Sequence, residues 1–186
     1  MAKKLSEMTL EELWELFPIF LVPHKTEWKS WFAEEKALIE ELLPEARRIS
    51  HIGSTAIPGI YAKAIVDILI ELPKDSDMQK AADILRANGF IQMSAENGRI
   101  SLNKGYTEKG FAERVFHLHL RFLGDNDELY FRDLLLSDAG LAHEYEALKL
   151  SLTGDFKHDR DGYTAAKGDF IRRNTAKAKE FFKEKY

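Results

Sequence analysis

The sequence contains no cysteine among its 186 residues. Disulfide bonds, thiol nucleophiles and thiolate metal sites are therefore excluded. No apolar run approaches the ~18 residues that a membrane-spanning helix needs, so we expect no insertion into a membrane. Residues 1–5 lack a long apolar stretch and are followed by Glu11 and Glu12, which is not the pattern of a secretory signal. These absences leave a cytoplasmic location as the default expectation.

The composition is that of an ordinary globular protein, with 45% hydrophobic and 31% charged residues. The formal net charge of -4 argues against a general nucleic-acid binder, so no nucleic-acid partner is expected. The chain shows no internal repeat, low-complexity tract or flexible linker. We therefore expect residues 1–186 to form a single domain, and no motif for an organic cofactor is evident.

Apolar periodicity predicts helices near both ends of the chain and strands in its centre. Helices are expected over residues 11–17, 24–43 and 78–88, around residues 131–135, over 141–152, and in one final helix after Gly154. Strands are expected over residues 48–52, 65–72, 90–93, 99–105 and 114–122, with a short edge strand at 19–22. This order predicts an α+β (α/β-like) domain, a sheet with helices packed against it and a helical C-terminal third.

Three of the predicted strands alternate between an apolar face and a face with reactive groups. The second faces carry Asp67 and Glu71, then Arg99, Ser101 and Asn103, then His117, His119 and Arg121. If the strands are neighbours with matching faces, these groups converge on one surface. The alternative is a solvated sheet face, which we favour for Arg99, Ser101 and Asn103. The two histidines, spaced i and i+2, suit metal binding or phosphate contact.

A Gly-Ser loop follows the predicted strand at residues 48–52. Gly53 lets the backbone approach a ligand closely, and Ser54 or Thr55 can cap a short helix whose free N–H groups attract phosphate. Lys63 precedes Asp67 by four residues and supplies positive charge. The alternative is a capped turn between two strands, because short Gly-Ser motifs occur widely.

Several blocks of the sequence resemble the GrpB-like family. The signature block is His-Ile-Gly-Ser-Thr-Ala-Ile-Pro-Gly-Ile at residues 51–60, followed by Lys63 and Ile-Val-Asp-Ile-Leu at 65–69. Phe-His-Leu-His-Leu at 116–120 and Phe-Arg-Asp-Leu-Leu at 131–135 resemble later blocks. Tyr145, Lys149, Tyr163 and Lys167 stand where the C-terminal helices of the family carry similar residues. The resemblance spans about residues 20–175.

The resemblance implies the fold of the nucleotidyltransferase superfamily, a mixed sheet packed with helices. It implies that Gly53 and Ser54 bind phosphate and that Asp67 binds a divalent metal, as in that superfamily, where carboxylates bind Mg²⁺. Some members resemble a domain fused to dephospho-coenzyme A kinase, which suggests a coenzyme A pathway enzyme as a partner. A nucleotide or another phosphorylated small molecule is the expected ligand.

The sequence departs from the superfamily pattern at Leu69, where a second carboxylate would stand. Glu71 is on the same face, but about 13 Å from Asp67 along the strand, too far for both to bind one ion. The third carboxylate is replaced by His117 and His119, and imidazole suits Zn²⁺ or Mn²⁺ better than Mg²⁺. The predicted metal ligands are therefore Asp67, His117 and His119, with Mg²⁺ or Mn²⁺ ranked ahead of Zn²⁺.

Two functions fit these residues. The first is an enzyme that transfers a nucleotidyl or phosphoryl group, with Asp67 holding a metal or acting as base and His117 or His119 orienting or protonating. Gly53, Ser54, Thr55 and Lys63 would hold phosphates, and Arg114 or Arg121 would balance charge. The second is a binding or accessory module without turnover, which Leu69 favours. A metal-dependent hydrolase using His51 with Asp67 and the two histidines ranks third.

Overall fold

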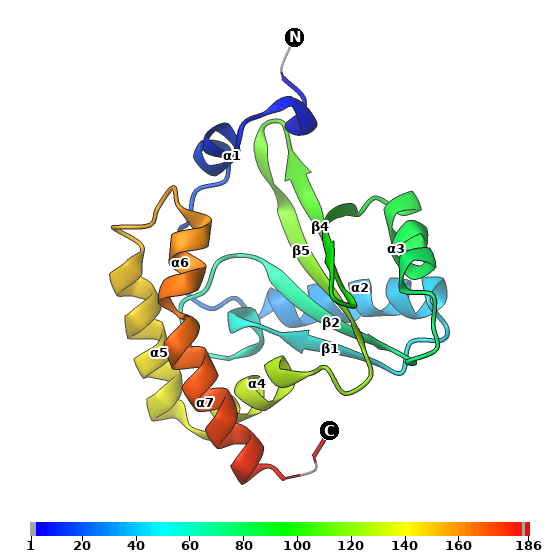
Figure 1. Cartoon of the computed structure of the whole chain (residues 1–186). Coiled ribbons are helices and arrows are strands. Elements are labelled where there is room, and N and C mark those ends of the chain that lie inside the picture. Colours follow the sequence, from blue (N-terminus) through cyan, green and yellow to red (C-terminus); the bar gives the residue numbers. More distant parts are fainter. Residues whose placement is uncertain (1–2, 184) are drawn as a thin grey trace.

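The computed structural model describes residues 3–183 and 185–186. A five-stranded mixed sheet in the order β1-β2-β5-β4-β3 lies at the centre of the molecule (Figure 1). The strands are β1 (Arg48–Ile52), β2 (Val66–Leu72), β3 (Ile91–Glu96), β4 (Arg99–Thr107) and β5 (Gly110–Phe122). β2 and β5 are parallel, and the other neighbouring pairs are antiparallel.

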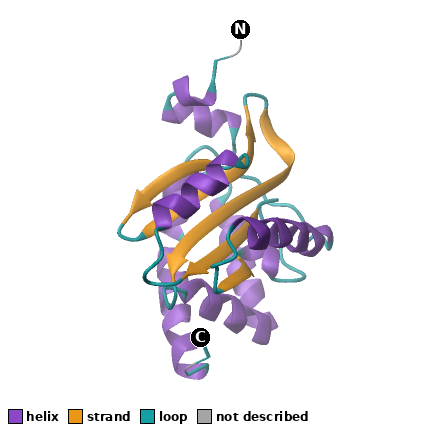
Figure 2. Ribbon diagram, turned by 90° about the vertical axis from the view of Figure 1, so that its right-hand side faces the viewer, coloured by secondary structure: helices purple, strands orange, loops and turns teal. Residues whose placement is uncertain are grey.

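Helices lie on both faces of this sheet (Figures 1 and 2). They are α1 (Leu10–Leu16), α2 (Glu27–Leu42), α3 (Met78–Ala87), α4 (Asp127–Ser137), α5 (Ala139–Leu152), α6 (Arg160–Ala166) and α7 (Gly168–Phe181), with 3₁₀ turns η1 (Leu5–Glu7) and η2 (Ser54–Ala56). The α2 and α3 helices cover one face, and α4 to α7 gather on the other. None of the helices formed by the described residues is long and apolar enough to cross a membrane.

The main core lies between the sheet and the pair α2 and α3. It buries the side chains that alternation assigned to the apolar strand faces, including Val66, Ile68, Leu118 and Leu120, against Trp28 of α2 and its neighbours. Removing this apolar area from water contributes roughly 25 cal/mol per Å². The burial fixes which way each strand faces, since a slip of one residue would turn every apolar side chain outward.

The opposite faces of the strands match, which is the condition that the alternation left open. Asp67 is the register partner of His117. On the other side of β5, Asn103 pairs with His117 and Ser101 with His119. Residues directly opposite in neighbouring strands point to the same face. The condition for convergence is therefore met for these polar groups.

The same face is largely covered rather than solvated. Leu69 is fully buried with Ile52 and Leu129, the last of which comes from α4. Asn103 is only 6% exposed, so the solvated interpretation is wrong for this residue. It holds for Arg99, whose side chain is 53% exposed. The C-terminal helices account for the difference, because periodicity within one strand does not show what packs on it.

Three predicted elements differ from the structure. The final helix is two helices, α6 and α7, that meet at Lys167, where Gly168 is a poor helix former. Residues 19–22 form no strand and make a single bridge between Val22 and Ala62. The strand predicted to stop at Gly105 continues through a bulge, where φ is +90° and a Cβ would overlap with the backbone of Arg114.

Candidate functional site

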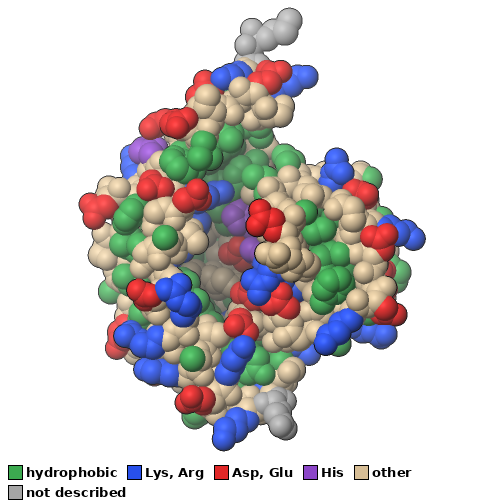
Figure 3. Space-filling view, in the orientation of Figure 1, with side chains coloured by type: hydrophobic (Ala, Val, Ile, Leu, Met, Phe, Trp, Pro, Cys, Tyr) green, Lys and Arg blue, Asp and Glu red, His purple; other side chains and the backbone are tan. Residues whose placement is uncertain are grey.

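A cavity of about 700 Å³ lies between the polar face of the sheet and the C-terminal helices. Figure 3 shows it as a hollow in the middle of the molecular face, with histidine and acidic side chains inside. A cavity of this size suits a ligand as large as a nucleotide. It brings together most of the predicted site residues, namely Gly53, Ser54, Thr55, Lys63, Asp67, His117 and His119.

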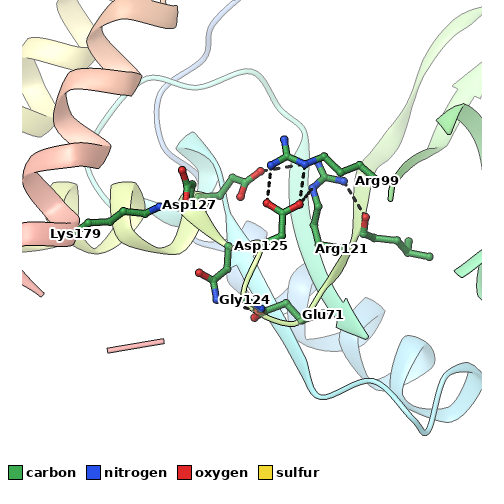
Figure 4. A network of polar contacts seen from close by, with 10 residues as sticks. Glu71, Arg99, Arg121, Gly124, Asp125, Asp127 and Lys179 are labelled. Carbon is green, nitrogen blue, oxygen red and sulfur yellow. Dashed lines mark hydrogen bonds and ion pairs between the residues drawn. The ribbon is translucent and has the colours of Figure 1, made fainter. Parts of the chain in front are cut away.

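Arg114 and Arg121 are not among the residues that line this cavity. Arg114 forms an ion pair with Glu34 on the α2 side of the molecule and lies over the Trp31 ring. Arg121 is buried at the far end of β5, with ion-pair distances of 3.9 Å to both Asp125 and Glu128. Figure 4 shows Arg121 and Arg99 gathered around Asp125, a cluster that holds the turn after β5. The placement of the two arginines does not support phosphate contact.

Gly53 and Asp67 are in close contact where β1 ends. The φ angle of Gly53 is +70°, a conformation that favours glycine. A Cβ atom at residue 53 would lie 3.1 Å from Cβ and Cγ of Asp67 and would overlap with its carboxylate. The glycine therefore allows the 53–56 loop to close against the aspartate.

Asp67 lies between two imidazoles. Its Oδ1 is 3.3 Å from Nδ1 of His117 and 3.3 Å from Nε2 of His119. Burial alone would raise the pKa of this carboxyl group, but hydrogen bonds from the two histidines outweigh burial and hold the pKa well below its usual range. The carboxylate is consequently ionised and acts only as an acceptor toward both rings.

His117 is the inner end of a hydrogen-bond chain from Arg160. Arg160 Nη2 is 2.7 Å from the hydroxyl oxygen of Tyr106, and this hydroxyl is 2.9 Å from Nε2 of His117. A guanidinium only donates, so Tyr106 accepts from Arg160 and donates to Nε2. The proton of His117 then lies on Nδ1, which faces Asp67. Burial lowers the pKa of His117 and favours this neutral form.

His51 supports the loop from outside the cavity lining. The Thr55 hydroxyl donates to the carbonyl of Ile65 at 3.1 Å, so it accepts from Nε2 of His51 at 2.9 Å. The imidazole also stacks on Phe32, and burial lowers its pKa to about 4. His51 is therefore neutral and orders the loop. The hydroxyl hydrogen of Thr55 is already used within the protein, which leaves its backbone N–H as the group suited to phosphate.

The cavity contains a group of basic side chains that the site prediction did not include. Lys149 of α5, Arg160 of α6 and Lys167 between α6 and α7 line it together with Lys63. Three other basic residues of the lining are ion-paired, Arg132 with Asp133, Arg172 with Asp169 and Lys179 with Asp127. Within the described residues, no Asp or Glu forms an ion pair with Lys63, Lys149, Arg160 or Lys167.

The missed lysines had one sequence signal, since Lys149 and Lys167 belong to the blocks that resemble the GrpB-like family. In the structure Lys149 is 2% exposed and donates to the carbonyl of Tyr61. Lys167 and Lys63 lie 4.3 and 5.8 Å from the centre of the Tyr163 ring. Burial lowers the pKa of Lys63 to about 7, and those of Lys149 and Lys167 to about 8.

The donor atoms of the cavity do not fit the magnesium site that the fold implies. Leu69 is fully buried at the position of the second carboxylate. Both ring nitrogens of His117 are engaged, by Asp67 and by Tyr106. Across residues 3–183 and 185–186, no group of three or more His, Asp or Glu side chains is arranged to hold a metal ion. The metal role of Asp67, His117 and His119 stays a prediction.

Comparison with known proteins decides the family. A family model described as "GrpB protein" matches residues 18–177. The chain belongs to the GrpB family. It is 33% identical to the glutamate-rich protein GrpB of Alkalihalophilus pseudofirmus, over 82% of this chain and 91% of that protein. It is also 30% identical to YqkA of Bacillus subtilis over 97% of this chain, but spans only 54% of the length of YqkA.

Solved structures confirm the fold. The crystal structure of a GrpB protein from Enterococcus faecalis matches with a TM-score of 0.76 at 24% identity, over 89% of this chain and 100% of that chain. The Cid1 poly(U) polymerase solved with MgGTP matches with a TM-score of 0.50 at 13% identity, over 76% of this chain and 44% of that chain. The GrpB chain therefore has the nucleotidyltransferase-type fold that the resemblance implied. It also matches a dephospho-CoA kinase of Mycolicibacterium paratuberculosis, at 26% identity over 44% of that protein.

Proposed function

We propose that the cavity binds a nucleotide or another phosphorylated small molecule and transfers a nucleotidyl or phosphoryl group from it to a small acceptor. One observation carries this proposal: the ionised Asp67, held by two histidines, faces the same cavity as the Gly53-Ser54 loop and the four basic side chains. A phosphate needs positive charge and N–H donors, and a transfer step needs a base beside it.

His119 is the base in this proposal. Asp67 orients the His119 ring by accepting from its Nε2–H, which leaves Nδ1 with a lone pair for a proton. The acceptor hydroxyl oxygen forms a bond to phosphorus as its proton passes to Nδ1 of His119. The bond from that phosphorus to the leaving oxygen breaks, and the leaving group keeps the electron pair. The basic side chains of the cavity stabilise the charge that develops on it.

The proposal can be tested by incubating the purified protein with labelled nucleoside triphosphates and a pool of small metabolites, with Mg²⁺, with Mn²⁺ and with a chelator. A labelled product is expected with the unaltered protein. Asp67→Asn and His119→Gln should lower the product by at least about a hundredfold, since a positioned base contributes ~10²–10⁴ in rate. Asp83→Asn, an exposed carboxylate on α3 at the other face of the sheet, serves as the control.

A second candidate function is a binding or accessory module that holds the same ligand without turnover. Leu69, buried where the superfamily has a catalytic carboxylate, favours this alternative. The match to a dephospho-CoA kinase suggests a partner of the coenzyme A pathway for such a module. Thermal stabilisation by phosphorylated ligands without any labelled product would support it. An absence of both stabilisation and product would contradict both functions.

A further inference from the structure

The four basic side chains of the cavity converge from separate elements onto one space. Lys63 comes from the loop before β2, Lys149 from α5, Arg160 from the start of α6 and Lys167 from the junction of α6 and α7. The ring of Tyr163 lies between two of them, 5.8 Å from Nζ of Lys63 and 4.3 Å from Nζ of Lys167. Arg160 is held by the hydroxyl of Tyr106, so its guanidinium has a defined position.

These side chains have hydrogen-bond donors that the protein itself does not use. Lys149 is almost completely buried and uses one ammonium hydrogen on the carbonyl of Tyr61. A lysine ammonium has three donors and an arginine five, so most donors of the group remain available to a ligand. Burying charges without counter-ions is costly, and the mutual repulsion of Lys63, Arg160 and Lys167 adds to this cost. An anion with several negative oxygens would remove both costs.

The acidic side chains of the cavity provide only part of that counter-charge. The single negative charge of Asp67, which accepts from His117 and His119, favours the ammonium forms of Lys63 and Lys167. Asp127 forms an ion pair with Lys179 at 2.5 Å, and Glu128 lies 3.9 Å from Arg121. Figure 4 shows Asp127 joined to Lys179. A divalent cation entering this space would therefore meet three lysines, one arginine and a single unpaired carboxylate, that of Asp67, which already accepts hydrogen bonds from two histidines.

We propose that Lys63, Lys149, Arg160 and Lys167 bind the phosphate chain of the ligand directly, in place of Mg²⁺, so that the cavity takes a polyphosphate in its metal-free form. This inference rests on the proposed function, because it names how the same cavity holds its ligand. Leu69 supports it independently: the sheet offers an apolar side chain where a magnesium site needs a carboxylate. The positive charge that a metal supplies elsewhere comes here from the C-terminal helices.

The test is isothermal titration of the purified protein with inorganic tripolyphosphate and with ATP, in a chelator and in excess Mg²⁺. Binding should be at least about tenfold tighter in the chelator than in Mg²⁺, because the magnesium complex carries less negative charge for the cations to bind. Sulfate at equal ionic strength controls for nonspecific charge screening.

Substitutions test whether binding depends on these four side chains or only on the overall charge of the protein. Lys167→Met and Arg160→Gln should each weaken tripolyphosphate binding by about tenfold or more, while Lys36→Met on α2 should not change it. Thermal melting shows that each variant is folded, and Arg160→Gln is the safer change if Lys167→Met does not fold. Binding that needs Mg²⁺, or that is equal in all variants, would overturn the inference and leave the proposed function standing. No binding of either probe in either buffer would overturn both.

Discussion

Gly53 and Asp67 are packed so closely that the site has no room for a side chain at residue 53. A Cβ atom there would lie 3.1 Å from Cβ and Cγ of Asp67, at a backbone φ of +70°. The glycine thus has two separate reasons to be present, one conformational and one steric. Both concern the placement of the 53–56 loop against the aspartate.

Gly53→Ala should therefore destabilise the protein and weaken ligand binding. With a φ of +70° and a ψ of −174°, the backbone lies in a region essentially restricted to glycine, so a side chain there costs about 1–3 kcal/mol, and displacement of the Asp67 carboxylate adds to this. Gly59→Ala is the control for a positive φ without a close contact, because Gly59 has a φ of +82° but no atom within 4 Å of its would-be Cβ. Thermal melting should show Gly53→Ala lower in Tm than Gly59→Ala by at least about 2 °C. Equal melting temperatures would show that the contact with Asp67 is unimportant.

Leu69→Asp should not restore a magnesium site. The leucine is fully buried with Ile52 and Leu129, so a carboxylate there would lose its hydration without gaining a partner. We expect a loss of about 3 kcal/mol or more in the free energy of unfolding, measured by urea denaturation. Addition of Mg²⁺ should not reverse it. A variant that is as stable as the unaltered protein and is further stabilised by Mg²⁺ would contradict this prediction.

Tyr106→Phe should remove the hydrogen bond to Nε2 of His117 without changing the tautomer of the ring. The ionised Asp67 still accepts from Nδ1, so the ring proton stays on that nitrogen. Nitrogen NMR of labelled histidine should show Nδ1–H in both proteins, with a shifted Nε2 resonance of His117 in the variant. Stability should fall by about 1 kcal/mol with the lost hydrogen bond. A His117 Nε2 resonance that is the same in both proteins would mean that Tyr106 does not donate to the imidazole.

Phosphate binding should weaken as pH rises above neutrality. In the ligand-free protein the pKa values of Lys63, Lys149 and Lys167 are lowered to about 7, 8 and 8, chiefly by burial. Lys63 also faces Arg160, Lys167, Lys149 and Asp67, and only the last favours its charged form. A bound polyphosphate favours the ammonium forms and raises these pKa values. Affinity should therefore be lost progressively from pH 7 to pH 9, by up to about tenfold per pH unit for each proton taken up.

Titrations at pH 8 in two buffers with different ionisation enthalpies measure this proton uptake directly. A net uptake of protons on binding is expected. Arg114→Gln, a basic residue outside the cavity, should leave the uptake unchanged, and Lys63→Met should reduce it. Release of protons, or affinity that increases from pH 7 to pH 9, would contradict the assignment of the lysines as phosphate ligands.

The sequence was sufficient to predict which side chains share a face of each strand, but not that the faces match between strands or which end of a face lies in the cavity. Alternation with a period of two placed Asp67 on one face of its strand and His117 and His119 on one face of theirs, and the strand register shows that these faces match. The same alternation included Arg121, which lies four residues beyond His117, about 13 Å along the strand, in a different cluster. The alternation of a strand indicates which face a side chain is on, but not which residues lie next to it along the strand.

The contact between Tyr106 and Arg160 is a second feature that could not be predicted from the sequence. Their hydrogen bond joins residues 54 positions apart, one on α6 and the other on β4. Neither belongs to a local motif, so no spacing could indicate the contact. Lys149 and Lys167 were visible as part of the family resemblance, but their meeting with Lys63 depends on how the C-terminal helices fold back over the sheet.

The most direct measurement for the central claim is a crystal structure of the protein with a non-hydrolysable nucleoside triphosphate, grown with a chelator present. We predict phosphate oxygens within hydrogen-bond distance of the Gly53-Ser54 backbone and of Lys167 and Arg160, with His119 facing the reacting phosphorus. A nucleotide bound elsewhere, or a cavity that stays empty at saturating nucleotide, would contradict it.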